Sequence, residues 1–147
     1  MRTRCPRSLH REAFVLKHGP VPKGLLVDHE NRRRTDCRLA NLRLATPSNN
    51  SCNRAKVHKR KGRNATSTFK GVWRKRARVL QSGELRTDTK PWVCEVHLRS
   101  EGKKHTSGHT TEKAAARKYN EVAGEWMGEF AVLNVVSDDD EGGQSGE

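Results

Sequence analysis

Long apolar segments, aromatic side chains and closely spaced cysteines are all scarce in this 147-residue sequence. Hydrophobic residues make up 32% of the chain and Phe, Trp and Tyr together 5%, so packing must be concentrated in a few short segments. No apolar run approaches the roughly 18 residues of a membrane-spanning helix, and the amino-terminal MRTRCPRSLH lacks the apolar stretch of a secretion signal. We therefore expect a cytoplasmic protein without a membrane span.

The four cysteines form no C-x-x-C pair. Cys5, Cys37, Cys52 and Cys94 are scattered along the chain, which favours isolated reduced thiols over a disulfide framework or a zinc site. A structural zinc ion held by His10 with Cys5, or by Cys37 with Cys52, stays open as the alternative.

Positive charge is abundant, with 30 Lys and Arg against 17 Asp and Glu, a net charge of +13 and a pI near 10.2. Such a surface favours a polyanionic partner, with nucleic acid first and an anionic membrane surface second. The membrane alternative is weaker because no basic amphipathic helix with a bulky apolar face is visible. Basic residues outnumber acidic ones by 17 to 4 in residues 1–63 and by 13 to 8 in residues 64–134, whereas residues 135–147 hold only 5 acidic ones.

This charge pattern, together with local composition, divides the chain. Residues 57–67 are basic and small polar without apolar periodicity, as in a linker. We therefore expect one module at residues 1–56, the linker at 57–67 and a second module at 68–134. The acidic, glycine-rich residues 135–147 are predicted to be a disordered tail.

In the first module, the apolar residues 24–29 predict a buried strand that ends with Asp28 and His29. A second short strand is expected at residues 42–45. The following Thr-Pro-Ser predicts a helix start, with Thr46 as the cap and Pro47 at the first helical position. This order brings the end of a strand beside the opening turn of a helix.

The polar residues at that junction suit phosphodiester hydrolysis, which needs an activated water and neutralisation of the charge on the phosphate. Asp28 offers a carboxylate and Asn50 a neutral amide oxygen, a pair that can bind magnesium, or another divalent cation such as manganese, and leave positions open. His29 is suited to take the proton from the attacking water. Asn41 would hold the loop or the imidazole ring in place.

At these positions the sequence resembles the HNH (ββα-metal) endonucleases, in particular the phage homing-endonuclease branch. The resemblance covers residues 10–54 and rests on His10-Arg11, Pro22-Lys23-Gly24, Asp28-His29, Asn41-Leu42-Arg43 and Asn50. It implies His29 as the general base, and Asp28 and Asn50 as metal ligands. It implies Asn41 as the residue that sets the structure of the site. The basic residues of this module expected to contact DNA are Arg32, Arg33, Arg34, Arg43 and Arg54.

Two residues depart from that family pattern. Glu30 stands where an apolar residue commonly follows Asp-His, and Cys37 stands where an Asn usually follows Asp36. The chain also begins only nine residues before His10. These departures keep open the alternative of a non-catalytic DNA-binding regulator on a degenerate nuclease scaffold.

The second module alternates like strands at residues 69–75 and 91–99, and a third strand is expected around residues 103–108. Residues 111–127 change to a helical period, with Ala115, Tyr119, Val122 and Trp126 on one face. The second module is therefore predicted to contain three antiparallel strands backed by one helix, and the whole chain is predicted to be α+β.

This module resembles the plant ethylene-response-factor type of DNA-binding domain over residues 67–134. The matching residues include Phe69-Lys70-Gly71-Val72, Trp92, Glu95-Val96, Tyr119-Asn120 and Leu133-Asn134. The resemblance implies a sheet that lies in the major groove, and the insertion at 77–90 is expected to project as a loop. The residues implied to face DNA are Lys70, Trp73, Lys75, His97 and Lys104. The alternative is that the aromatic residues only pack the core and that the basic strands form a solvated face.

The sequence therefore predicts a magnesium-dependent DNA endonuclease that works as a monomer on double-stranded DNA. One active site would nick one strand per binding event, and homing-type or phage-encoded biology is implied by the resemblance alone. A basic RNA-binding protein is the third possibility.

Overall fold

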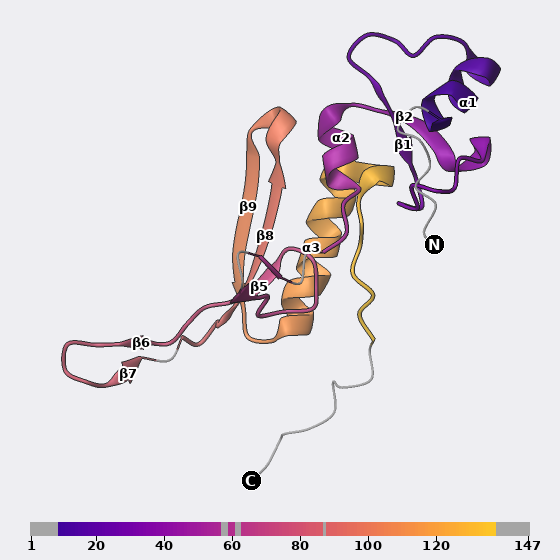
Figure 1. The fold of residues 1–147 in the computed structure, drawn as a ribbon. Helices are drawn as coiled ribbons and strands as arrows, with labels where there is room; N and C mark the ends of the chain where they lie inside the picture. Colours follow the sequence, from indigo (N-terminus) through magenta and orange to yellow (C-terminus); the bar gives the residue numbers. More distant parts are fainter. Residues whose placement is uncertain (1–8, 57–58, 61–62, 87, 138–147) are drawn as a thin grey trace. The chain divides into compact units, whose positions relative to one another are not determined.

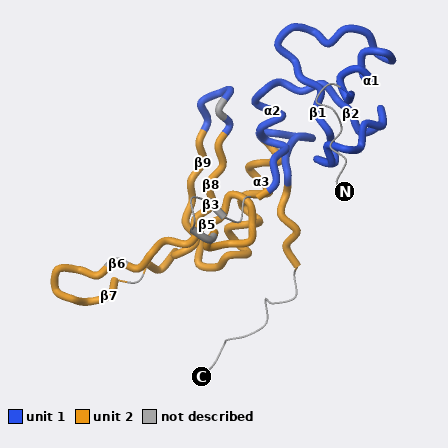
Figure 2. Tube along the Cα trace, in the orientation of Figure 1, with its two compact units in different colours: residues 1–55, 98–103, 126–132 blue, residues 56–97, 104–125, 133–147 orange. Residues whose placement is uncertain are grey.

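The computed structural model describes residues 9–56, 59–60, 63–86 and 88–137. Cys5 and most of the tail predicted to be disordered lie outside these residues. Figure 2 shows two compact units. Unit 1 comprises Met1–Ala55, Leu98–Lys103 and Trp126–Val132, and unit 2 comprises Lys56–His97, Lys104–Glu125 and Leu133–Glu147. Helices and antiparallel sheets occur together, which confirms the α+β class. No helix in the described part of the chain is long and apolar enough to cross a membrane.

Unit 1 contains two paired strands and two α-helices (Figure 1). Its elements are α1 (Leu9–His18), β1 (Leu26–His29), the 3₁₀ turn η1 (Leu39–Asn41), β2 (Leu42–Ala45), α2 (Pro47–Cys52), the 3₁₀ turns η2 (Arg99–Glu101) and η3 (Gly128–Phe130). Strand β1 pairs antiparallel with β2, and Asp28 lies opposite Arg43. Both strands and the start of α2 occur where the sequence predicts them, with Thr46 accepting a hydrogen bond from the Asn49 N–H at 3.1 Å.

Helix α1 was not predicted. Its sequence LHREAFVLKH buries only Phe14, so the apolar face is too narrow to give a clear helical period. The helix ends at Gly19, whose φ of +82° is the left-handed conformation typical of a helix C-terminus. The Gly19 N–H donates to the Val15 carbonyl at 2.9 Å.

The core of unit 1 draws on residues from both ends of the sequence. Ala45 and Cys52 pack with Leu98 and Phe130 in one buried cluster. Trp126 and Met127 are partly buried against the same cluster.

Unit 2 is a three-stranded antiparallel sheet with a long helix. The strands β5 (Val72–Arg74), β8 (Trp92–Leu98) and β9 (Lys103–His109) lie in the order β5-β8-β9, and α3 spans Glu112–Met127. These elements confirm the three predicted strands and the predicted helix. The buried side chains of the sheet include Val72, Cys94 and Val96. Those of α3 are Ala115, Ala116, Tyr119, Val122 and Ala123.

Gly71 allows the helix to approach the sheet. A Cβ atom at this position would lie 2.1 Å from Cδ2 of Tyr119 and 2.8 Å from the Glu95 carbonyl oxygen, and φ is +70°. Only glycine fits such a conformation at this distance.

The segment after α3 returns to unit 2 through two asparagines. The Asn134 side chain accepts from the Lys70 N–H at 2.6 Å and donates to the Lys70 carbonyl at 3.1 Å. Asn120 of α3 donates to the Asn134 carbonyl at 2.8 Å and accepts from its N–H at 2.7 Å. These bonds tie the segment to both the helix and the start of the sheet.

Two short hairpins complete unit 2. Strand β3 (Lys59–Arg60) pairs with β4 (Arg63–Asn64) inside the expected linker. Strand β6 (Arg78–Val79) pairs with β7 (Leu85–Arg86), so the insertion expected to be a loop contains a hairpin, which projects from the sheet in Figure 1.

Candidate functional site

Among the described residues of unit 1, four polar ones are buried. Asp28 and His29 are each 8% exposed, and Asn41 and Asn53 are each 7% exposed. Buried polar groups are stable only when hydrogen-bonded or charge-paired, so their contacts define how the site is built.

Asn53, the last residue of this group, holds the end of β1. Its side-chain NH₂ donates to Asp28 Oδ2 at 2.9 Å and to the His29 carbonyl at 3.0 Å. A longer contact of 3.4 Å reaches the Glu30 carbonyl. Asn53 lies three residues after Asn50 in the sequence, and that spacing alone does not indicate its contact with Asp28.

Arg43 is the second partner of the Asp28 carboxylate. The two residues are cross-strand neighbours, and Arg43 Nε lies 3.5 Å from Asp28 Oδ2. Both partners of Asp28 thus contact the same oxygen. Among the described residues, Oδ1 is left without a hydrogen bond or ion pair and keeps its lone pairs for another partner.

The environment of His29 keeps its imidazole neutral near pH 7. Burial lowers the pKa of His29 below 6.5, and the nearby His10 lowers it further, while Asp28 and Asp36 act in the opposite direction. The rings of His10 and His29 lie 4.9 Å apart between centroids. The buried Nε2 atom of His29 has no hydrogen-bond partner among the described residues. A neutral imidazole with an unpartnered nitrogen is suited to accept a proton.

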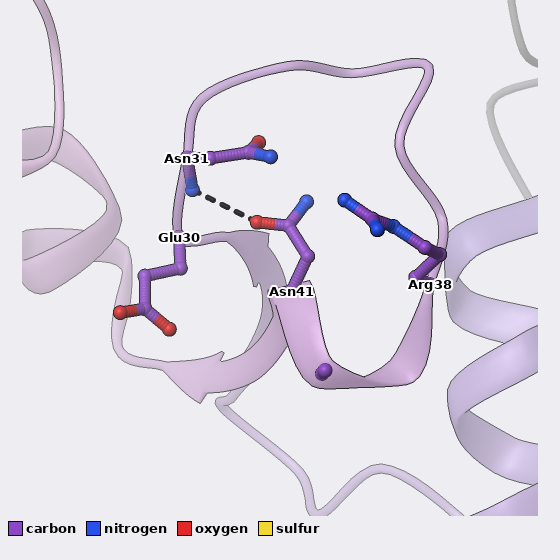
Figure 3. A pocket seen from close by; sticks show the side chains of 5 residues that line it. Glu30, Asn31, Arg38 and Asn41 are labelled. Carbon is purple, nitrogen blue, oxygen red and sulfur yellow. Dashed lines mark hydrogen bonds between the residues drawn. The ribbon is translucent and has the colours of Figure 1, made fainter.

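Asn41 closes the loop that follows His29 (Figure 3). Its side-chain oxygen accepts from the Asn31 N–H at 2.9 Å, and its NH₂ donates to the Asp36 carbonyl at 2.7 Å. Its own carbonyl accepts from the Glu30 N–H at 2.9 Å. Asn41 therefore fixes both ends of the basic loop at residues 30–36.

A pocket of about 480 Å³ lies beside this loop, lined by Glu30, Asn31, Arg38, Ala40 and Asn41. In Figure 3 the side chains of Asn31, Arg38 and Asn41 converge, whereas that of Glu30 points away from them. Arg38 donates two hydrogen bonds of 2.8 Å to Asp36, which hold the pKa of that carboxyl well below its usual range.

Asn50 lies in α2, and α2 contacts both β1 and β2. Its side chain is half-buried and makes no hydrogen bond with another residue in the part of the chain that is described. Asp28 Oδ1 and the Asn50 side-chain oxygen are thus uncommitted, and carboxylate and amide oxygens are ligand types that divalent cations prefer. In the same part of the chain, no three His, Cys, Asp or Glu side chains are grouped as a metal cluster.

The arginines expected to contact DNA differ in exposure. Arg32, Arg33 and Arg34 are exposed on the basic loop, and Arg54 is exposed after α2. Arg32 adopts a left-handed backbone conformation with φ of +63°. Arg43 is different, because its side chain is only 13% exposed.

In unit 2, three of the side chains expected to face DNA surround Glu95. The Trp73 Nε1–H donates to Glu95 Oε2 at 3.1 Å, His97 contacts Glu95 Oε1, and the Lys104 ammonium lies 3.5 Å from the same oxygen. Bonds from His97 and Trp73 and the charge of Lys104 lower the pKa of Glu95. From the sequence, Glu95 is only a match to the family pattern, and these contacts were not predicted.

The other two expected residues have different neighbours. The Lys75 ammonium pairs with Asp88 at 2.7 Å, and both side chains are partly exposed. Lys70 is half-buried, and its backbone is bound by Asn134.

Two paired strands, a short helix and a buried Asp-His pair are features of a small nuclease module. Residues 7–52 match the family model described as HNH endonuclease, which is the family whose resemblance the sequence predicted for this segment. The chain is 31% identical over 129 residues to an uncharacterized HNH endonuclease of Acanthamoeba polyphaga mimivirus, covering 87% of this chain and 57% of the relative. It is also 31% identical over 87 residues to Protein 3.8 of Escherichia phage T7, covering 59% of this chain and 67% of that protein. No solved structure matches the chain significantly.

The chain thus spans little more than half of the mimivirus relative's length. The family model and this relative are both described as HNH endonucleases.

Proposed function

We propose that this protein is a divalent-metal-dependent endonuclease that hydrolyses phosphodiester bonds of double-stranded DNA. The observation that carries the proposal is the buried His29, whose lowered pKa and unpartnered Nε2 suit a general base, next to Asp28 in a domain of the HNH endonuclease family.

Asp28 and Asn50 would hold the ion, which we propose is magnesium or manganese. When bound, such an ion neutralises charge on the scissile phosphate and polarises the attacking water. His29 takes the proton from that water, a step that contributes about 10²–10⁴-fold when the base is well placed. Asn53 orients the Asp28 carboxylate, and Asn41 holds the loop that follows His29.

The basic loop and the sheet of unit 2 would bind the duplex. Arg32, Arg33 and Arg34 are exposed beside the site, where phosphate contacts position the strand. The ethylene-response-factor-like sheet would contribute Lys70, Trp73, Lys75, His97 and Lys104. We propose the division into a nuclease module at 1–56, a linker at 57–67 and a DNA-binding module at 68–134. We further propose a monomeric, cytoplasmic, homing-type enzyme that nicks one strand.

The alternative is a DNA-binding regulator that has lost cutting. Glu30 and Cys37, the two departures from the family pattern, favour it. The buried Asp28 and His29 favour the enzyme, because a site without catalytic use need not retain a buried acid and a buried unpartnered imidazole.

Supercoiled plasmid, incubated with the full chain and Mg²⁺ or Mn²⁺, tests the proposal. We expect open-circular product from the wild type, none in EDTA, and a loss of about 10²-fold or more for His29→Ala. Duplex binding in EDTA should be the same for both proteins. Equal cutting by His29→Ala would remove His29 from the mechanism, and binding without cutting in either metal would favour the regulator.

A further inference from the structure

The carboxy-terminal residues 126–132 are part of the same compact unit as the HNH domain. Phe130 packs with Ala45 and Cys52, and Trp126 and Met127 cover the cluster. Turn η3 contacts α2, and Figure 2 shows the same segment in the colour of unit 1. The nuclease unit therefore includes residues that lie more than 70 positions after its own last helix.

This segment holds the Arg43 side chain in place. The guanidinium carbon lies 4.0 Å from the centroid of the Phe130 ring, and Nη1 donates to the Glu129 carbonyl at 3.0 Å. The Glu129 carboxylate is 3.8 Å away and 73% exposed, so this ion pair adds little. The ring contact and the carbonyl bond are the ones that fix the guanidinium.

The fixed guanidinium in turn meets Asp28. Its Nε is 3.5 Å from Oδ2, the oxygen that also receives the Asn53 hydrogen bond. The Asn53 hydrogen bond and the Arg43 ion pair on one oxygen restrict rotation of the carboxylate and direct the other oxygen toward a third partner. Since Arg43 is 13% exposed and already has three partners, it has little surface left for a DNA phosphate.

We propose that Arg43 is a positioning residue that acts through Asp28, and that residues 126–130 are the part of the fold that places it. The inference rests on the proposed function, in which Asp28 is a metal ligand. It replaces direct phosphate contact by Arg43 as the role of this side chain.

The test compares full-length Arg43→Lys and Phe130→Leu with the wild type. Lysine keeps the charge but loses the planar fork, and leucine keeps an apolar side chain but removes the ring beneath the guanidinium. Arg86→Lys is the matched control, because Arg86 is exposed on β7 and has no role in the site or in the proposed DNA contacts.

We expect kcat for plasmid cutting to fall about 10–100-fold in both variants, as for other residues that orient metal ligands. The Kd for duplex DNA in EDTA, and its salt dependence, should stay within about twofold of the wild type. The rise in melting temperature produced by saturating Mn²⁺ without DNA should shrink in both variants. Arg86→Lys should match the wild type in all three measurements.

The inference would be overturned in favour of phosphate contact if Arg43→Lys bound duplex DNA more weakly in EDTA, with a salt dependence of log K reduced by about one, and kept the wild-type kcat at saturating DNA. Cutting and Mn²⁺ response equal to the wild type in Arg43→Lys would also overturn it. If the wild type does not cut, the proposed function fails, and the Mn²⁺-dependent melting shift still decides the inference: loss in Arg43→Lys supports it, and retention or no shift in the wild type refutes it.

Discussion

Replacement of Asn53, the residue that follows α2, by alanine should destabilise the protein more than any single polar substitution within that helix. The side chain is 7% exposed and its NH₂ donates to the Asp28 carboxylate at 2.9 Å and to the His29 carbonyl at 3.0 Å. A hydrogen bond to a charged group contributes about 1.5–3 kcal/mol, and a buried acceptor left without its donor adds a further cost of about 1 kcal/mol or more. We therefore expect Asn53→Ala to lose about 2–4 kcal/mol.

That loss is a large part of the roughly 5–15 kcal/mol that stabilises an ordinary domain. The measurement is urea unfolding followed by circular dichroism, in EDTA so that metal binding does not contribute. Asn49→Ala is the control, because Asn49 lies in the helix that Asn53 caps and only its backbone N–H and carbonyl are hydrogen-bonded. It should change stability by no more than about 0.5 kcal/mol. Equal stability of Asn53→Ala and Asn49→Ala would refute the view that Asn53 holds the end of β1.

Other outcomes test the acid response, the close packing of unit 2 and the charge of the DNA-binding surface. Burial lowers the pKa of both His29 and His109 below 6.5, so the unfolded chain binds more protons than the folded one. The free energy of unfolding, measured with urea at a series of pH values, should therefore be highest above pH 6.5 and fall as the pH drops through the lowered pKa values. The fall should be smaller in His109→Gln. Gly71→Ala should lose more than about 3 kcal/mol in thermal or urea unfolding, because the new Cβ would meet the Tyr119 ring at 2.1 Å, whereas Gly102→Ala, with φ of +63° but open space, should lose only about 1–2 kcal/mol. Duplex affinity measured in EDTA should fall about 10³–10⁵-fold between 50 and 200 mM salt if 6–10 phosphates are neutralised, and a flat salt dependence would contradict a basic DNA-binding surface.

Local sequence signals predicted most of the regular structure. The apolar run before Asp28 predicted β1, and Thr46-Pro47 predicted the start of α2. Both signals depend only on residues close together in the sequence. The amphipathic period of α3 was equally clear, with Tyr119 and Val122 buried as expected. Helix α1 was missed because its only buried side chain, Phe14, leaves no repeating apolar pattern.

Contacts between residues far apart in the sequence could not be predicted. The cation–π contact between Arg43 and Phe130 joins residues 87 positions apart, and the sequence around either residue does not predict it. The role of Glu95 depends on cross-strand neighbours, since Trp73 and Lys104 come from the two strands on either side of β8. The contact of Asn53 with Asp28 depends on how α2 packs on β1.

The half-activating Mn²⁺ concentration for plasmid cutting tests most directly whether Asp28 and Asn50 hold the catalytic ion beside His29. We predict that Asn50→Ala raises this concentration roughly tenfold or more and that excess Mn²⁺ partly restores the rate, as loss of a ligand requires. Asn49→Ala should need the same Mn²⁺ concentration as the wild type. An Asn50→Ala protein that is half-activated at the wild-type concentration would contradict the account.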